Sequence, residues 1–146
     1  DKDLNVEEEL GFLVNPNQEL SPKITKITGI KNEDLKDKPP FIAYYDKLIE
    51  FFIGEQVLAA HNLPFDSNVL KYNLIRIDKL IKFPWPPKHL CTIEVGEKVW
   101  GIKRKLTDIY LEVTGKEHKG AHRAIDDVKA TIEVLKWYKK EGHLND

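Results

Sequence analysis

The sequence lacks several features that mark secreted and membrane proteins. Its 146 residues include one cysteine, Cys91, which excludes an internal disulfide framework and fits a reducing compartment. No apolar run approaches the roughly 18 residues that a membrane-spanning helix needs. The acidic N-terminal residues also lack the basic and apolar regions of a signal peptide. We therefore expect a cytoplasmic protein.

Excess charge of one sign is also absent, because the formal net charge is −1. This value argues against a protein that coats nucleic acid through charge alone. The charge is nevertheless uneven: residues 1–60 carry seven basic and twelve acidic side chains, and residues 61–146 carry sixteen and twelve. The basic half suits a polyanionic substrate, or it is simply a solvated surface rich in lysine.

The apolar residues that are present alternate between the periods of strands and helices. The expected strands cover residues 10–14, 57–60 and 89–92, a loop with a short helix covers 24–30, and the expected helices cover 41–52, 66–77, 93–100, 106–113 and 125–140. This alternation predicts an α/β fold. At 41% hydrophobic residues the chain can bury a core without disulfides, so we expect one domain over residues 1–146.

Two polar clusters stand at the ends of these elements. The first, with His61, Asn62 and Asp66, follows the apolar run 57–60, which suits a strand buried on both faces. The second spans residues 122–127, where the longest helical pattern begins. Ligands of open α/β sheets bind at the carboxyl ends of the strands. We expect the two clusters to meet there.

The residue types in these clusters suit phosphoryl chemistry. Carboxylates such as those of Asp66 and Asp127 are ligands for Mg²⁺ or Mn²⁺, and two such ions can clamp the attacking and leaving oxygens of a phosphoryl displacement. Histidine is the side chain that most readily takes a proton from an attacking water at neutral pH, and His122 is the candidate for this role.

Each of these residues also has a structural interpretation. An aspartate near a helix start often caps the helix or stabilises its dipole. Asn62 can bond a phosphate or hold a loop, and helical periodicity cannot choose between Asp126 and Asp127 because both lie off the apolar stripe. His118 has no evident partner in the sequence, so we expect it to be solvated.

Two segments together resemble the DnaQ-like, or DEDDh, family of 3′-to-5′ exonucleases, which includes polymerase proofreading subunits. They are Ala60-His61-Asn62-x-x-Phe65-Asp66 and Ala121-His122-Arg123-Ala124-Ile125-Asp126-Asp127. The spacing of the family's third motif selects Asp127 over Asp126. The resemblance extends over nearly the whole chain, through segments such as 14–16, 27–30, 90–92 and 105–106.

The resemblance implies a ribonuclease-H-like fold with a central mixed sheet flanked by helices. It implies two divalent metal ions, Mg²⁺ or Mn²⁺, and stepwise release of nucleoside monophosphates from single-stranded 3′ ends, with DNA expected over RNA. A polymerase or another replication or repair protein is an expected partner. Carried over by position, Asp66 and Asp127 become metal ligands and His122 the general base. Four residues would line the path of the terminal nucleotides: Asn62, Phe65, Thr28 and Gly29.

The family's first motif, an Asp-x-Glu pair on the central strand, is not found in this sequence. Residues 10–14 already correspond to the family's third strand, so the first one or two strands and their acidic pair are expected to be missing. Three explanations stay open: a segment outside this sequence, a segment supplied by another chain, or a noncatalytic relative that binds nucleic acid or a polymerase-like partner. Unpaired strand edges are costly to bury, which favours the first two.

Overall fold

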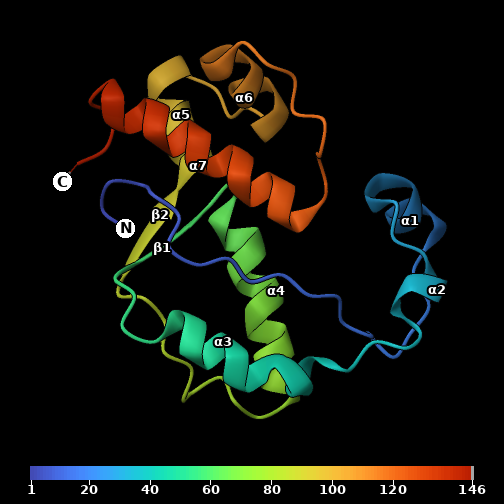
Figure 1. Cartoon of the computed structure of the whole chain (residues 1–146). Coiled ribbons are helices and arrows are strands. Elements are labelled where there is room, and N and C mark those ends of the chain that lie inside the picture. Colours follow the sequence, from blue (N-terminus) through green and yellow to red (C-terminus); the bar gives the residue numbers. More distant parts are fainter. Residues whose placement is uncertain (146) are drawn as a thin grey trace.

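A computed structural model describes residues 1–145, so Asp146 of the expected domain lies outside the described residues. Helices surround a small sheet (Figure 1). The elements in chain order are α1 (Pro22–Thr28), α2 (Asn32–Leu35), the 3₁₀ helix η1 (Phe41–Tyr44), α3 (Tyr45–Phe52), β1 (Val57–Ala60), α4 (Leu63–Arg76), β2 (Lys88–Cys91), α5 (Thr92–Trp100), α6 (Leu106–Thr114) and α7 (Ala124–Lys140).

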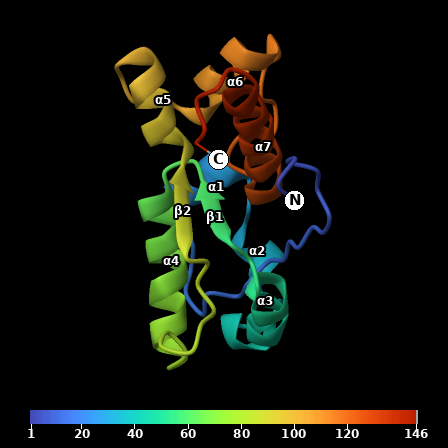
Figure 2. The same cartoon turned by 90° about the vertical axis from the view of Figure 1, so that its left-hand side faces the viewer.

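The sheet consists of β1 and β2, which run parallel and are connected through α4. Val57 pairs with Lys88 and Ala60 with Cys91, so both strands end at the same edge. Helix α4 lies along one side of the strand pair (Figure 2). The α/β prediction is confirmed, although the expected mixed sheet is represented among residues 1–145 by these two parallel strands alone.

The predicted strand at residues 10–14 is wrong, because this segment is extended but forms no ladder. Side-chain packing holds it instead. Phe12 stacks on Tyr44 with ring centroids 4.0 Å apart, and the Tyr44 hydroxyl donates to the Leu13 carbonyl at 3.1 Å. Gly11 lies so close to α7 that a Cβ there would come within 2.9 Å of Ile125. Although β2 leaves one edge of β1 free, residues 10–14 form no ladder with that edge, so their strand pattern does not lead to a strand.

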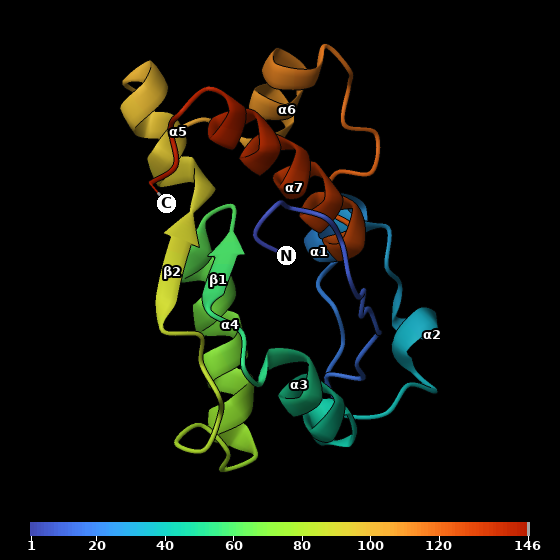
Figure 3. The same ribbon diagram turned by 60° about the vertical axis from the view of Figure 1, so that its left-hand side comes forward.

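Strand β1 is less buried than its apolar sequence predicts. Its residues alternate between exposed and half-buried, and Val57 is 48% exposed. The expectation of burial on both faces is therefore wrong. The alternation means that only one face of β1 is covered by the rest of the described chain. The edge of β1 that β2 does not occupy faces the N-terminal segment and α7 (Figure 3).

The main core lies beside the sheet, between the C-terminal helices. Ile109 of α6 and Val134, Leu135 and Tyr138 of α7 are buried together, with partly buried side chains of α5 packed around them. Gly96 of α5 permits this packing, because a Cβ there would lie 2.7 Å from the Tyr138 hydroxyl. Helix α7 is thereby fixed relative to β2, whose chain continues directly into α5.

Most helix predictions are confirmed within a few residues. The main exception is α4, which begins at Leu63 and not at Asp66, with Pro64 in its first turn. Proline suits the first turn because no intrahelical acceptor awaits its missing N–H. Asp66 is therefore the fourth residue of the helix and stands in its first turn. Within residues 1–145, no helix combines the length and the apolar character needed to cross a membrane.

Candidate active site

The end of β1 leads into α4 through a sharp backbone turn at Asn62. Asn62 has φ 62° and ψ 56°, in the left-handed region, which asparagine tolerates better than most residues. Its carbonyl accepts hydrogen bonds from the N–H groups of Phe65 and Asp66 at 3.0 and 3.4 Å. This turn presents Phe65, which is 64% exposed, and Asp66 beside the end of the strand.

His61 joins three parts of the site. Its Nδ1 lies 2.8 Å from Thr92 Oγ1 at the start of α5, and its Nε2 lies 3.0 Å from the Arg104 carbonyl. Because a carbonyl only accepts, Nε2 carries a proton and donates to it. Burial lowers the pKa of His61, and the Arg104 carbonyl and the charge of Asp127 partly offset this effect. A neutral ring therefore ties the residues before α6 to the end of β1.

The start of α7 is organised around Asp127. The backbone N–H of His122 donates to both carboxylate oxygens of Asp127, at 3.2 and 3.1 Å. His122 has φ 70°, and these bonds help to hold that uncommon conformation. The Nε2 atom of His118 lies 2.7 Å from Asp127 Oδ1, and the His118 side chain is only 7% exposed. The expectation of a solvated His118 is therefore wrong.

A cavity of about 1170 Å³ collects both polar clusters. Its walls include the side chains of the two expected carboxylate ligands, the expected base and three of the four expected substrate-binding residues: Asp66, Asp127, His122, Asn62, Phe65 and Thr28. The basic residues Lys103, Arg104 and Lys105 also line it. The expectation that the two clusters meet in space is confirmed.

Two neighbouring residues lie outside this lining. Gly29, with φ 72°, ends α1 beside Arg123, and a Cβ at Gly29 would lie 3.2 Å from Arg123 Nη2. Asp126 packs against Gly120, where a Cβ would meet the Asp126 side chain at 2.5 to 2.6 Å. The cavity thus contains Asp127 and not Asp126, the choice that periodicity had left open.

The two carboxylates influence each other electrostatically. Burial raises the pKa of the Asp66 carboxyl, and the negative charge of Asp127 raises it further. Like charges in one cavity disfavour simultaneous ionisation. Such an arrangement is characteristic of functional sites, where a bound cation or substrate compensates the repulsion.

Comparison with known families agrees with this geometry. The model of the RNase T exonuclease family matches residues 1–135. The chain belongs to this exonuclease family. The resemblance to DnaQ-like proteins is confirmed, because similar proteins include epsilon subunits and PolC-type forms of DNA polymerase III.

The chain is similar in sequence to DNA polymerase III proteins, including the following three. It is 30% identical over 137 residues to a PolC-type DNA polymerase III of Clostridium perfringens, covering 93% of the chain and 9% of that protein. It is 37% identical over 126 residues to the DNA polymerase III epsilon subunit of Rickettsia prowazekii, covering 84% and 55%. For the Aquifex aeolicus epsilon subunit the identity is 29% over 132 residues, covering 89% and 63%. The chain therefore spans only part of each relative.

A solved structure shares the fold. Exonuclease X in complex with 5′ overhanging duplex DNA superposes with a TM-score of 0.66 at 24% identity, covering 96% of this chain and 78% of that one. The likeness supports the ribonuclease-H-like class for the arrangement of β1, α4 and α7 described above.

The side chains that could bind a metal ion are of the right type for a hard divalent cation, but they are few. Asp66 and Asp127 supply carboxylate oxygens, which Mg²⁺ and Mn²⁺ prefer. Within the part of the chain that the structure describes, however, no group of three or more His, Cys, Asp or Glu side chains is placed to hold a metal ion. Cys91 is buried and forms no part of such a group. A full ligand shell would need oxygens beyond these two side chains.

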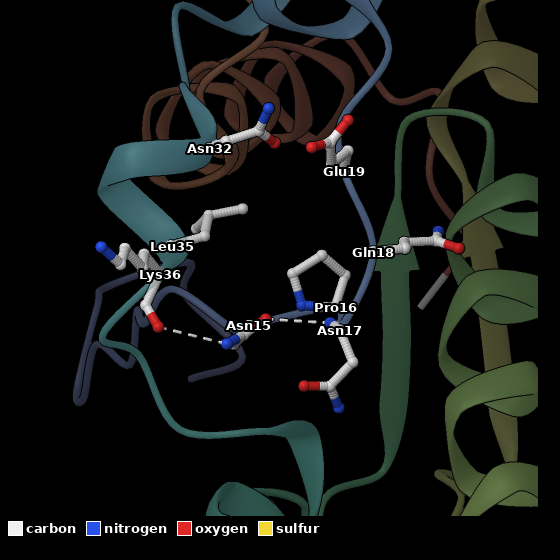
Figure 4. Close-up of a pocket in the computed structure, with 8 residues that line it drawn as sticks. All are labelled: Asn15, Pro16, Asn17, Gln18, Glu19, Asn32, Leu35 and Lys36. Atoms are coloured by element: carbon white, nitrogen blue, oxygen red, sulfur yellow. Dashed lines mark hydrogen bonds between the residues drawn. The ribbon is translucent and has the colours of Figure 1, made fainter.

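A second hollow, of about 310 Å³, lies between the N-terminal segment and α2 (Figure 4). Asn15 organises it, because its Nδ2 donates to the Lys36 carbonyl at 3.3 Å and its Oδ1 accepts from the Asn17 N–H at 2.9 Å. None of the candidate site residues lines this hollow. We therefore place the active-site candidate in the larger cavity.

Sequence reasoning missed Arg104, which lines the larger cavity, and two residues outside the lining, Thr92 and His118, which contact lining residues. Thr92 and Arg104 contact His61 from segments 31 and 43 positions away, and His118 reaches Asp127 from an irregular loop. No periodic pattern marks such contacts. The only signal was the basic run at residues 103–105, which stood in the basic half of the chain.

Proposed function

We propose that this chain forms most of a metal-dependent 3′-to-5′ exonuclease domain that acts on single-stranded ends, with DNA preferred over RNA. The observation that carries the proposal is the meeting of Asp66, Asp127 and His122 at one cavity with a basic wall. Asp66 comes from a segment more than fifty positions away from the one that holds His122 and Asp127. The two carboxylates suit a cation, and the histidine suits the proton of an attacking water. Membership of the exonuclease family supports the same reaction class.

The residues of the chain would divide the work. Asp66 and Asp127 would hold a divalent cation, which would polarise the scissile phosphate and stabilise the charge that develops there. The His122 imidazole would accept a proton from the attacking water as its oxygen bonds to phosphorus. The P–O3′ bond then breaks, and the shortened strand keeps a 3′ oxygen that takes a proton from solvent. The other product is a nucleoside 5′-monophosphate.

Substrate contacts would come from the rest of the cavity. Phe65 is an exposed aromatic ring on which a terminal base could stack. Asn62 and Thr28 add polar side chains, and Gly29 lies beside them at the end of α1. Lys103 and Lys105 are exposed and face the same space, so they would meet backbone phosphates.

The Asp-x-Glu pair that this sequence lacks would be supplied by additional strands of the sheet. Three observations support this part of the proposal: β1 has an edge that β2 does not occupy, residues 10–14 are extended without a partner, and the cavity beside β1 has apolar walls such as Leu58, Val128 and Leu135. A strand added there would satisfy backbone groups of β1 and complete the ligand set. A segment outside this sequence, or another chain, would supply it.

Hydrolysis of a 5′-labelled single-stranded oligonucleotide tests the proposal. Wild type, Asp66→Ala, Asp127→Ala and His122→Ala are compared with Mg²⁺ or Mn²⁺ and with a chelator. Asp126→Ala is the matched control, because Asp126 neighbours Asp127 but lies outside the cavity lining. The assay is run on this chain and on a longer form that restores any upstream segment.

We expect shortening from the 3′ end that requires the cation and is lost in the three cavity variants but not in Asp126→Ala. Activity confined to the longer form would locate the missing acidic pair upstream. Folded proteins of both lengths that leave the oligonucleotide intact would refute the proposal. Cleavage of small phosphoesters without cleavage of oligonucleotides would indicate a different phosphohydrolase.

A noncatalytic relative that binds nucleic acid or a polymerase-like protein is the second candidate. The small number of acidic ligands among residues 1–145 favours it. Such a protein would bind oligonucleotide equally well with and without His122. Similarity to proteins named as DNA polymerase III subunits supports a polymerase as the partner in either case. The expected cytoplasmic location stays a prediction.

A further inference from the structure

The loop that connects α6 and α7, residues 115–123, is attached to Asp127 at two points. His118 donates from Nε2 to Oδ1 at 2.7 Å, and the His122 N–H donates to Oδ1 and Oδ2 at 3.2 and 3.1 Å. The carboxylate that accepts these bonds stands on the first turns of α7. One acceptor therefore holds two loop residues that are four positions apart.

His118 is the more constrained of the two histidines. Its side chain is 7% exposed, and its ring lies 5.5 Å from the ring of Tyr110 on α6. It thus bridges α6 to α7 across the loop. His122 is exposed, and its imidazole accepts or donates no hydrogen bond within residues 1–145. The ring that is buried and bonded is not the ring that faces the cavity.

The bonding pattern leaves part of the Asp127 carboxylate available. Each carboxylate oxygen has two lone-pair positions. Oδ1 accepts from His118 and shares the His122 N–H, whereas Oδ2 receives only the His122 N–H. Oδ2 therefore keeps capacity for a further ligand while His118 fixes the orientation of the group.

We infer that His118 is a positioning residue, which holds the Asp127 carboxylate and the 115–123 loop so that Asp127 and His122 face the cavity together. Its effect on hydrolysis rests on the proposed function, whereas its effect on the loop does not. Partners that orient a ligating carboxylate commonly change metal affinity or activity by about 10- to 100-fold when they are removed.

The test compares His118→Ala, His118→Asn and His118→Gln. Glutamine can place an amide nitrogen near the position of Nε2, whereas asparagine is too short to reach Oδ1. His89→Ala is the matched control, because His89 is exposed on β2 and forms no side-chain hydrogen bond within the described residues. Far-UV circular dichroism establishes that each variant is folded.

The first measurement is the rate of tryptic cleavage after Lys119 in the cation-free protein, followed by mass spectrometry. We expect His118→Ala and His118→Asn to be cleaved about tenfold faster than wild type, because the loop loses a bond to a charged acceptor. His118→Gln and His89→Ala should be cleaved at nearly the wild-type rate. Equal cleavage of wild type and His118→Asn would overturn the inference, even if His118→Ala does not fold.

The second measurement is oligonucleotide hydrolysis with saturating Mn²⁺ in the active form of the protein. We expect kcat to fall about 10- to 100-fold in His118→Ala with KM little changed, and His118→Gln to recover most of the loss. Full turnover in a variant whose loop is open would overturn the inference. Wild-type protein without hydrolysis would instead refute the proposed function, and the cleavage after Lys119 would then decide the role of His118 alone.

Discussion

Asp66 of α4 and Asp127 of α7 line the same cavity, and burial together with the charge of Asp127 raises the pKa of the Asp66 carboxyl. Two like charges that face each other destabilise the folded protein when no cation lies between them. A protein that keeps such a pair gives up some stability at neutral pH. This cost is understandable if both groups serve a charged ligand.

Asp66→Asn should therefore stabilise the cation-free protein at pH 7. Because the folded-state pKa of Asp66 is raised, its contribution to stability is greatest below the ordinary value of 3.8 and is lost as the pH rises through the raised value. Asp66 is exposed enough for solvent to screen it, so we expect the thermal midpoint to rise by only about 1–2 °C.

The pH dependence supplies the control for this prediction. The difference between Asp66→Asn and wild type should disappear below about pH 3, where the carboxyl is mostly protonated in both the folded and the unfolded state. Asp126→Asn, outside the cavity lining, should show no gain at pH 7. If the thermal midpoint of Asp66→Asn were below that of wild type at pH 7, repulsion between Asp66 and Asp127 would not be destabilising the protein.

Thr92→Val should destabilise the protein by about 1–3 kcal/mol, because it leaves Nδ1 of His61 without a partner. Thr92 is fully buried, and valine has nearly its shape without the hydroxyl. Urea unfolding at pH 7.5 measures the change. Thr25→Val is the control, since Thr25 is half-buried and its hydroxyl makes no hydrogen bond within residues 1–145. Equal midpoints for both variants would argue against a structural role for the His61 bond.

Replacing Lys103 and Lys105 together by alanine should weaken the binding of a single-stranded oligonucleotide. It should also make that binding less dependent on the salt concentration. The guanidinium of the intervening Arg104 is engaged by Glu112 at 3.0 Å and by the ring of Trp100 at 5.0 Å, so the two lysines are the freer cations of this run. Each phosphate contact contributes about 0.7 to the slope of log K against log salt for single strands. We expect the slope to fall by about 1.4.

Fluorescence anisotropy in a chelating buffer measures this slope without hydrolysis. Lys140→Ala, which removes an exposed lysine at the other end of α7 from Asp127, is the control and should leave it nearly unchanged. A slope that falls in Lys140→Ala by half as much as in the double variant would mean that binding depends on total charge rather than on this wall of the cavity, because the control removes one charge and the double variant two.

The sequence predicted the local features of this molecule best. The helix at Ala124–Lys140 was predicted within one residue of its observed bounds, and the apolar run Val57–Ala60 is followed by residues that turn the chain. Residues 10–14 have an equally good strand pattern, but a strand also needs a pairing edge, which a local pattern cannot supply. The same reason explains why Val57 is exposed: burial depends on what covers the strand.

The candidate site was predictable where its residues stand in motifs and not where they stand in loops. Family spacing selected Asp127, and the cavity contains it. His118 lies nine positions from Asp127 without any helical relation to it, so only the path of the loop brings them together. Polar contacts that depend on loop geometry leave no period in the sequence.

Asn62→Gly separates two roles of Asn62 that the sequence left open. Glycine adopts the left-handed conformation of residue 62 without strain, so we expect the free energy of unfolding to stay within about 0.5 kcal/mol of wild type. Asn62→Ala, which strains the same backbone, should lose about 1 kcal/mol. The Asn62 side chain makes no capping bond and faces the cavity, so both variants should raise KM for the oligonucleotide. A wild-type KM in the glycine variant, with a raised KM in the alanine variant, would show that Asn62 serves the turn alone.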